Sequence, residues 1–304
     1  MATFKPGLVH APVTPFKADH SIDYETYSKL IEFHLKNGAE AIAAPMPAGE
    51  DMSLKDDEQG VLLDFIIKQV KGRVPVIAHV SDAGTTIAVE RAKQAAKAGA
   101  AAIVSHPPYF WHPKASMVTE HLVQIGNATK LPYFLCSPPV EDVGTPLTTE
   151  ITLDVIDRVP TLQGVVDATM DFVIMVETVS LGRAKRPEFQ LLSATDYMVT
   201  NGVIGGMGVF SPLSAVAPKL VKQVYELCVK QQFTQAREGQ ENIAELAHCL
   251  KLAGLAGLKG AMRAMGRDCG RPRPPSRALT GAEQTKLAAD LQAMKFLQAE
   301  PRGW

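Results

Sequence analysis

Histidines and acids stand where short apolar segments of this sequence end, and these side chains are the first candidates for chemistry. His79 closes one such segment and Asp82 follows it, His106 closes the next segment, and Glu50 follows an earlier one. Imidazole titrates near neutral pH, so it can take up or release a proton, and either ring nitrogen can bind a metal. We therefore predict His79 and His106 as catalytic residues.

The two histidines allow three interpretations. Together with a nearby acid they could exchange protons with a substrate or anchor a polar ligand. They could instead hold a metal, or they could be hydrogen-bonded packing residues. His10 lies within the first segment and His112 in the loop after the fourth, but the sequence has no HxH or HExxH spacing. We therefore expect neither a metal nor another cofactor.

Cys136 is a further candidate because a thiolate is a strong nucleophile. A reactive thiolate needs a positive neighbour that lowers its pKa, and the segment around Cys136 offers none. The sequence favours a small apolar pocket residue here. The other cysteines (Cys228, Cys249 and Cys269) are far apart and form no CxxC motif, so we expect all four to be reduced.

Short apolar segments alternate with longer amphipathic ones over the first two thirds of the chain. Strands are predicted at 8–13, 41–46, 74–80, 101–106, 132–137, 162–168, 189–193 and 203–210. Helices are predicted between them, for example at 24–36, 56–70, 86–98, 116–128 and 149–159. Parallel strands must be joined by crossovers, so eight such units predict an α/β fold, the (β/α)8 TIM barrel.

The last part of the chain breaks this rhythm. It reads as helical at 220–232, 233–250 and 255–265, and a proline-rich stretch at 271–275 interrupts the pattern. A final helix is predicted to begin at the capping box formed by Thr280 and Glu283. We expect a barrel over residues 1–218 and a C-terminal helical extension over 219–304, packed together as a single structural unit.

Composition excludes several classes of partner. The 304 residues are 46% hydrophobic and 21% charged, with a net charge of -1. No basic face is available for nucleic acid or anionic lipid. The chain also has no signal-like start and no apolar run long enough to span a membrane. We expect a cytoplasmic protein that binds a small molecule, with no nucleic acid and no membrane partner.

A set of short motifs resembles one enzyme family when taken in order and spacing. The motifs are Val13-Thr14-Pro15-Phe16, Gly49-Glu50, Val74-Pro75-Val76-Ile77-Ala78, Pro107-Pro108-Tyr109, Gly164 with Asp171, Leu191-Leu192-Ser193, Gly208-Val209-Phe210-Ser211 and Arg273-Pro274-Pro275. From about residue 7 to 291 the chain resembles the dihydrodipicolinate synthase / N-acetylneuraminate lyase family. The resemblance implies a TIM barrel and a homodimer or homotetramer.

The resemblance also implies that the family's usual chemistry is lost. The strand that should end in a Schiff-base lysine has Val166, which offers no lone pair to attack a carbonyl. The family's two threonines before Gly-Glu are replaced by Pro47 and Ala48. Cys136 takes the place of a proton-relay tyrosine, and Glu141 takes that of the arginine that clamps a substrate carboxylate. A second relay tyrosine, which acts across a subunit contact, corresponds to Phe110. We expect Val166 to point into the barrel.

Two functions fit this pattern. The first is a lyase or hydro-lyase that acts on a small organic acid by acid and base catalysis, without an imine. The second is a non-catalytic relative that binds a small ligand or serves as a structural subunit. Ligand pockets are mostly apolar with few polar anchors. Strand ends and family motifs predict as ligand-binding residues Pro47, Ala48, Glu50, Tyr109, Cys136, Ser137, Val166, Ser193 and Phe210.

Overall fold

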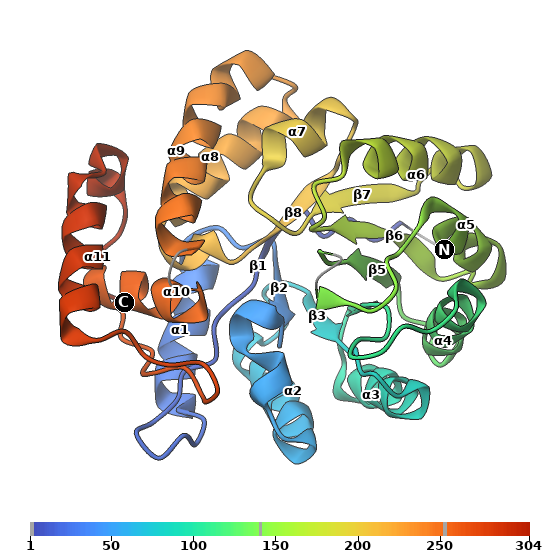
Figure 1. Ribbon diagram of the computed structural model, residues 1–304, viewed down its shortest axis with the longest axis horizontal. Helices are drawn as coiled ribbons and strands as arrows, with labels where there is room; N and C mark the ends of the chain where they lie inside the picture. Colours follow the sequence, from blue (N-terminus) through green and yellow to red (C-terminus); the bar gives the residue numbers. More distant parts are fainter. Residues whose placement is uncertain (1–2, 140–141, 252–253) are drawn as a thin grey trace.

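Eight parallel strands close on themselves in chain order, and helices surround them (Figure 1). The computed structural model describes residues 3–139, 142–251 and 254–304. The strands are β1 Leu8–His10, β2 Ala41–Ala44, β3 Val76–His79, β4 Ala102–Ser105, β5 Tyr133–Ser137, β6 Leu162–Asp167, β7 Gln190–Ser193 and β8 Gly208–Ser211. The helices that follow them are α1 Tyr24–Lys36, α2 Asp56–Val70, α3 Thr85–Ala98, α4 Ala115–Asn127, α5 Thr149–Arg158, α6 Phe172–Lys185, α7 Met198–Val203 and α8 Pro218–Val229. The predicted TIM barrel is confirmed.

Beyond α8, three further helices among the described residues continue the C-terminal part of the chain, beside α1 and α8 in Figure 1. They are α9 Phe233–Lys251, α10 Gly254–Ala264 and α11 Gly281–Ala293. Thr280 caps α11, and its hydroxyl oxygen accepts from the Glu283 amide, which confirms the predicted capping box. None of the helices described for this chain is long and apolar enough to cross a bilayer.

The predicted strand at 203–210 was wrong over its first half. Val203 ends the short helix α7, and β8 begins only at Gly208. Gly205 lies between them with a φ of 83°, a left-handed conformation that turns the chain and that glycine adopts without a steric penalty. The apolar pair Val203-Ile204 therefore belongs to the end of a helix, although its β-branched side chains favour a strand.

Helix α6 was not located from the sequence because it has no clear apolar stripe. Met175 and Val179 are buried against the barrel, whereas Phe172, Val173 and Val176 are exposed. A helix that is apolar on both sides gives no 3.6-residue period. Asp171 begins this helix by accepting hydrogen bonds from the amides of Val173 and Ile174.

The barrel interior is a separate apolar core, closed off from the layer between strands and helices. Val166 is fully buried in this interior, in register with Cys136 on β5 and Leu192 on β7. Its neighbour Val165 packs on the outer side with the helices. Alternation along β6 thus directs Val166 inward, as predicted, and turns Asp167 outward.

His10 and His34 form a buried pair between β1 and α1. Their Nδ1 atoms are 2.9 Å apart, and both side chains are fully excluded from solvent. One Nδ1 must carry a proton and the other must accept it, so the contact requires at least one neutral ring. Burial lowers the pKa of His10 to about 3, and burial together with His10 lowers that of His34 well below its ordinary value.

This pair should make the fold sensitive to acid. In the unfolded chain both imidazoles regain a pKa near 6.5, so below that pH the unfolded state binds more protons than the native state. The contribution of the pair to the free energy of unfolding is therefore fully present above pH 6.5. It decreases as the pH falls toward the pKa values of the folded state, by up to about 1.4 kcal/mol per pH unit for each histidine.

Urea unfolding between pH 7.5 and 4.5 measures this slope. His34→Gln keeps a hydrogen-bonding group beside His10 but removes one titrating ring, so the slope should decrease. His248→Gln, at an exposed position, is the matched control and should leave the slope unchanged. Equal slopes for His34→Gln and the unmodified protein would contradict the assignment.

Candidate functional site

A cavity of about 820 Å³ lies above the carboxyl ends of the strands. This is the end of a TIM barrel where active sites are built, because the loops after the strands meet there. Seven of the predicted site residues line it, from strands or from the loops that follow them: Pro47, Ala48, Glu50, His106, Tyr109, Cys136 and Phe210. The C-terminal extension closes part of the cavity with Leu255, Pro275 and Ser276.

The other four predicted residues lie elsewhere. Val166 is packed in the barrel interior and does not line the cavity. Ser137 lies on the outer side of β5 near Asp167, and the Ser193 hydroxyl contacts Thr195. His79 faces a groove between α2 and α3, behind the cavity wall.

His79 and His106 nevertheless form one group. Their ring centres are 4.6 Å apart, and both side chains are buried. His79 Nδ1 lies 3.3 Å from Asp51 Oδ2, and its Nε2 lies 2.6 Å from Ser81 Oγ. Ser81 Oγ also accepts from the His106 amide at 2.7 Å. All these contacts are satisfied when His79 donates from Nδ1 to Asp51 and accepts the Ser81 proton at Nε2.

Burial and neighbouring groups give Asp51 and His106 different charges at pH 7. Burial lowers the pKa of His106 to about 3, with His79 adding to the shift and Asp51 opposing it, so His106 is neutral at pH 7. Burial alone would raise the pKa of the Asp51 carboxyl, but the His79 hydrogen bond and the two rings outweigh it and the pKa is lowered. The group therefore presents one carboxylate and one neutral imidazole to the cavity.

Asp51 is the functional candidate that the sequence did not reveal. It directly follows Glu50, and it lines the cavity as the first residue of a short 3₁₀ turn, Asp51–Ser53. The acids named from the sequence were Glu50, which pairs with Lys259, and Asp82, which forms an ion pair with Arg91 at 3.0 Å. Asp51 could have been noted as the second acid after the end of β2, although nothing in the sequence connects it to His79.

Cys136 is poorly suited to nucleophilic attack. Burial raises the pKa of its thiol far above the ordinary range, and Asp167 and Asp51 add to the shift. The thiolate is therefore scarce at neutral pH. Glu141, which was predicted to take the place of a carboxylate-clamping arginine, lies outside the described residues. Within those residues, no cluster of three or more histidine, cysteine or acidic side chains is placed to hold a metal ion.

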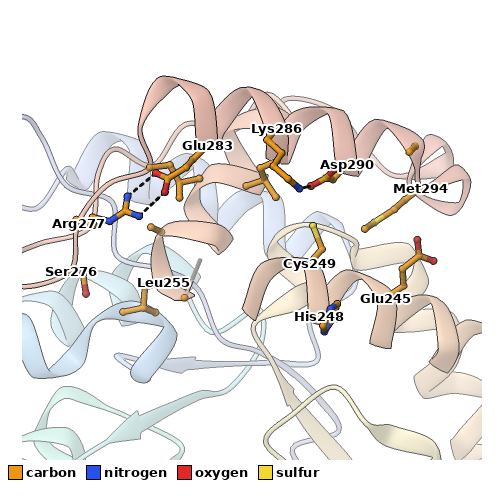
Figure 2. Close-up of a pocket in the computed structure, with 15 residues that line it drawn as sticks. Glu245, His248, Cys249, Leu255, Ser276, Arg277, Glu283, Lys286, Asp290 and Met294 are labelled. Carbon is orange, nitrogen blue, oxygen red and sulfur yellow. Dashed lines mark hydrogen bonds and ion pairs between the residues drawn. The ribbon is translucent and has the colours of Figure 1, made fainter. Parts of the chain in front are cut away.

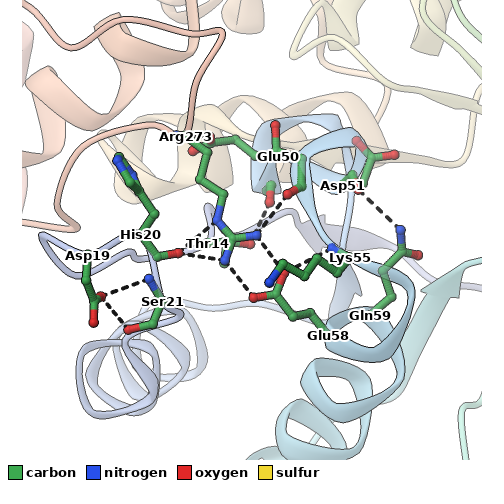
Figure 3. A network of polar contacts seen from close by, with 12 residues as sticks. Thr14, Asp19, His20, Ser21, Glu50, Asp51, Lys55, Glu58, Gln59 and Arg273 are labelled. Carbon is green, nitrogen blue, oxygen red and sulfur yellow. Dashed lines mark hydrogen bonds and ion pairs between the residues drawn. The ribbon is translucent and has the colours of Figure 1, made fainter.

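Glu50 fastens the extension onto the barrel mouth (Figure 3). Its carboxylate lies 2.6 Å from Lys259 Nζ on α10 and accepts the Arg273 amide at 2.7 Å. The Arg273 guanidinium donates two hydrogen bonds to Glu58, at 2.6 and 2.7 Å. Both cations also lie over the Phe16 ring, at 4.5 and 4.3 Å. Glu50 itself has a left-handed backbone, φ 58°, which these contacts hold in place.

A second groove of about 820 Å³ lies within the extension, between α9, α10 and α11 (Figure 2). Its cations are already paired, Arg277 with Glu283 and Lys286 with Asp290, each at 2.6 Å. It shares Leu255 and Ser276 with the barrel cavity, so the two spaces adjoin. Neither His79 nor His106 lines it.

Comparison with known proteins shows which family the chain matches. The model of the dihydrodipicolinate synthetase family matches residues 5–294. The chain is 29% identical to a 4-hydroxy-tetrahydrodipicolinate synthase of Caldicellulosiruptor bescii, over 92% of this chain and 93% of that protein. It is also 29% identical to an uncharacterized DapA-like lyase of Halobacterium salinarum, over 96% of this chain and 94% of that protein. A dihydrodipicolinate synthase structure from Thermotoga maritima has a TM-score of 0.89 at 25% identity, over 97% and 100%.

The buried ion pair between Glu50 and Lys259, the Glu50 tie, yields a stability prediction. Lys259→Met leaves the Glu50 carboxylate buried without its partner, which should cost about 3 to 5 kcal/mol in the free energy of unfolding. Adding Glu50→Gln removes the stranded charge and should recover part of that loss. Lys286→Met breaks an exposed ion pair instead and should cost at most about 1 kcal/mol. Urea unfolding compares the variants, and a Lys259→Met cost no larger than the Lys286→Met cost would rule out this role.

Proposed function

Because this chain belongs to the dihydrodipicolinate synthetase family, we propose that it is a lyase that cleaves a carbon–carbon or carbon–oxygen bond without forming an imine. The observation that carries the proposal is the group of Asp51, His79 and His106 at the cavity wall. Val166 stands where the family resemblance expects the Schiff-base lysine. No lysine lines the cavity among the residues described.

The geometry suggests a role for each side chain. Asp51 is ionised and faces the cavity, so it can accept a proton from a substrate carbon or hydroxyl. His79 donates to Asp51 from behind and holds the carboxylate in one orientation, which makes it a positioning residue. His106 is neutral, and its ring can donate a hydrogen bond to a substrate oxygen on which negative charge develops.

The proposed reaction needs no group beyond these. In an elimination, the base takes a proton from the carbon next to the scissile bond. The C–H electron pair becomes the new double bond, and the leaving group departs with the electrons of the bond that breaks. Asp51, which then carries the proton taken from the carbon, returns it to the leaving group. Acid and base catalysis of this kind contributes about 10² to 10⁴-fold in rate.

A non-catalytic relative that binds a small ligand is the second candidate. The observation that favours it is the low pKa of His106, because an imidazole with a pKa of about 3 is a weak base. The mostly apolar wall of the cavity suits a ligand site equally well. Proton exchange in a bound ligand separates the two candidates.

A homodimer or homotetramer is also part of the proposal. Phe110 is 98% exposed on the rim of the cavity with a left-handed φ of 80°, and Trp111 beside it is also exposed. Large exposed aromatic side chains are enriched where proteins meet partners. A second copy of the chain would cover this rim.

Proton exchange tests the catalytic role. Ligands found by thermal shift are incubated with the protein in D₂O, and loss of their C–H signals is followed by NMR. Asp51→Asn and His106→Asn should slow exchange by about 10² to 10⁴-fold while the ligand still binds. Asp82→Asn, which alters an acid paired with Arg91, is the control and should exchange normally. No exchange in any ligand bound by the unmodified protein would leave the non-catalytic function.

The protein should form no imine with pyruvate. Valine has no lone pair to attack the carbonyl, so borohydride reduction in the presence of pyruvate should leave the intact mass unchanged. Val166→Lys alone should not restore the family reaction, because the new amine would emerge without a proton relay. A family member that has the lysine is the positive control. A stoichiometric adduct on a lysine inside the barrel would overturn the proposal.

A further inference from the structure

We infer that the barrel cavity takes an organic molecule with an apolar body and a positively charged head, and that it disfavours carboxylates. The inference rests on the proposed function, since it concerns the same cavity. It replaces the small organic acid that the sequence predicted, because the charges around the cavity are of the wrong sign for an acid.

The charged side chains that line the cavity are all acidic within the described residues. They are Glu50, Asp51 and Asp142, and no lysine or arginine lines the cavity there. Lys259 balances Glu50, and His79 contacts Asp51. Asp142 is exposed and has no ion-pair partner in the part of the chain that the structure describes, so its charge is available to a ligand.

Among the described residues of the loop after β2 that line the cavity, Ser53 alone has a side-chain hydroxyl. Pro47 has no backbone N–H, and Ala48 has no hydroxyl, although both line the cavity. A carboxylate taken from water needs replacement hydrogen bonds, and without them its burial is unfavourable. Beside the ionised Asp51 carboxylate the same group would also be repelled.

The remaining wall suits an apolar body and a cation. Tyr109, Phe110 and Phe210 line the cavity together with the apolar side chains of Met46 and Leu255, and Phe110 lies exposed at its rim. Aromatic faces attract ammonium groups through their quadrupole, and the effect is larger where water is excluded. An ammonium group in this cavity would be attracted by the acidic side chains and by the aromatic faces, whereas a carboxylate would be repelled by the same acids.

Three probes with one body and different charges test this inference. They are phenethylamine, phenylacetamide and phenylacetate, and their binding to the full chain is measured by calorimetry at pH 7.5 and low salt. The amine should bind at least tenfold more tightly than phenylacetate, with the amide between them. Phenylacetate binding as tightly as the amine overturns the inference, and so does the absence of binding by all three at 10 mM.

Two variants locate the source of the preference. Asp142→Asn should weaken the amine severalfold and leave the amide unchanged, because only the amine has a charge to lose. Asp64→Asn makes the same change at an exposed site outside the cavity and should alter neither. Equal effects of both variants would mean that the preference comes from net charge and not from the cavity, which also overturns the inference.

The inference and the proposed function can fail separately. The ranking of the three probes depends on the charges of the cavity and requires no catalysis. Proton exchange depends on Asp51 and His106 and is followed in bound ligands whose C–H lies next to a carbonyl group. A carboxylate that binds best and exchanges its protons would refute the ligand class and support the lyase. An amine that binds best supports the ligand class, and lack of exchange in a bound ligand with an acidic C–H would separately refute the lyase.

Discussion

The ionic tie at Glu50 is the constraint on which the mouth of the barrel depends. One carboxylate, held on a left-handed backbone after β2, contacts Lys259 on α10 and the amide of Arg273 beyond it. This brings Leu255 and Ser276 over the strand ends and sets the next residue, Asp51, against His79. The roof and the polar wall of the cavity are therefore positioned by the same turn. A buried ion pair of this kind adds little net stability, but its geometry is specific.

The barrel could be predicted from the sequence because each strand and helix is marked by a pattern within its own short segment. Strands buried on both faces read as short apolar runs, and amphipathic helices between them have a 3.6-residue period. Prediction was wrong where this contrast is lost. Val203 and Ile204 look like a strand but end α7, since Gly205 turns the chain after them. Helix α6 has apolar residues on both its buried and its exposed sides, so no period marks it.

The site could be predicted only in part, because its chemistry depends on contacts between distant residues. Strand ends pointed to His79 and His106, and the structure brings their rings together. Asp51 was missed because its contact with His79 depends on the turn at Glu50. The negative charge of the cavity could not be predicted either, because its acidic side chains come from more than one loop. The inward direction of Val166 follows from alternation along one strand and can be predicted from the sequence, whereas the charge of the cavity cannot.

The tie at Glu50 also bears on the order in which the molecule is assembled. Glu50 and Arg273 are separated by 223 positions. Contacts between residues so far apart form late. Closing such a long loop lowers the entropy of the chain, and contacts between residues closer in sequence must form first to offset that loss. During synthesis the strands and early helices leave the ribosome long before the segment that roofs them. The strand ends of the nascent barrel are therefore uncovered. The ligand cavity forms only after the residues that cover it, such as Leu255 and Ser276, have been synthesised.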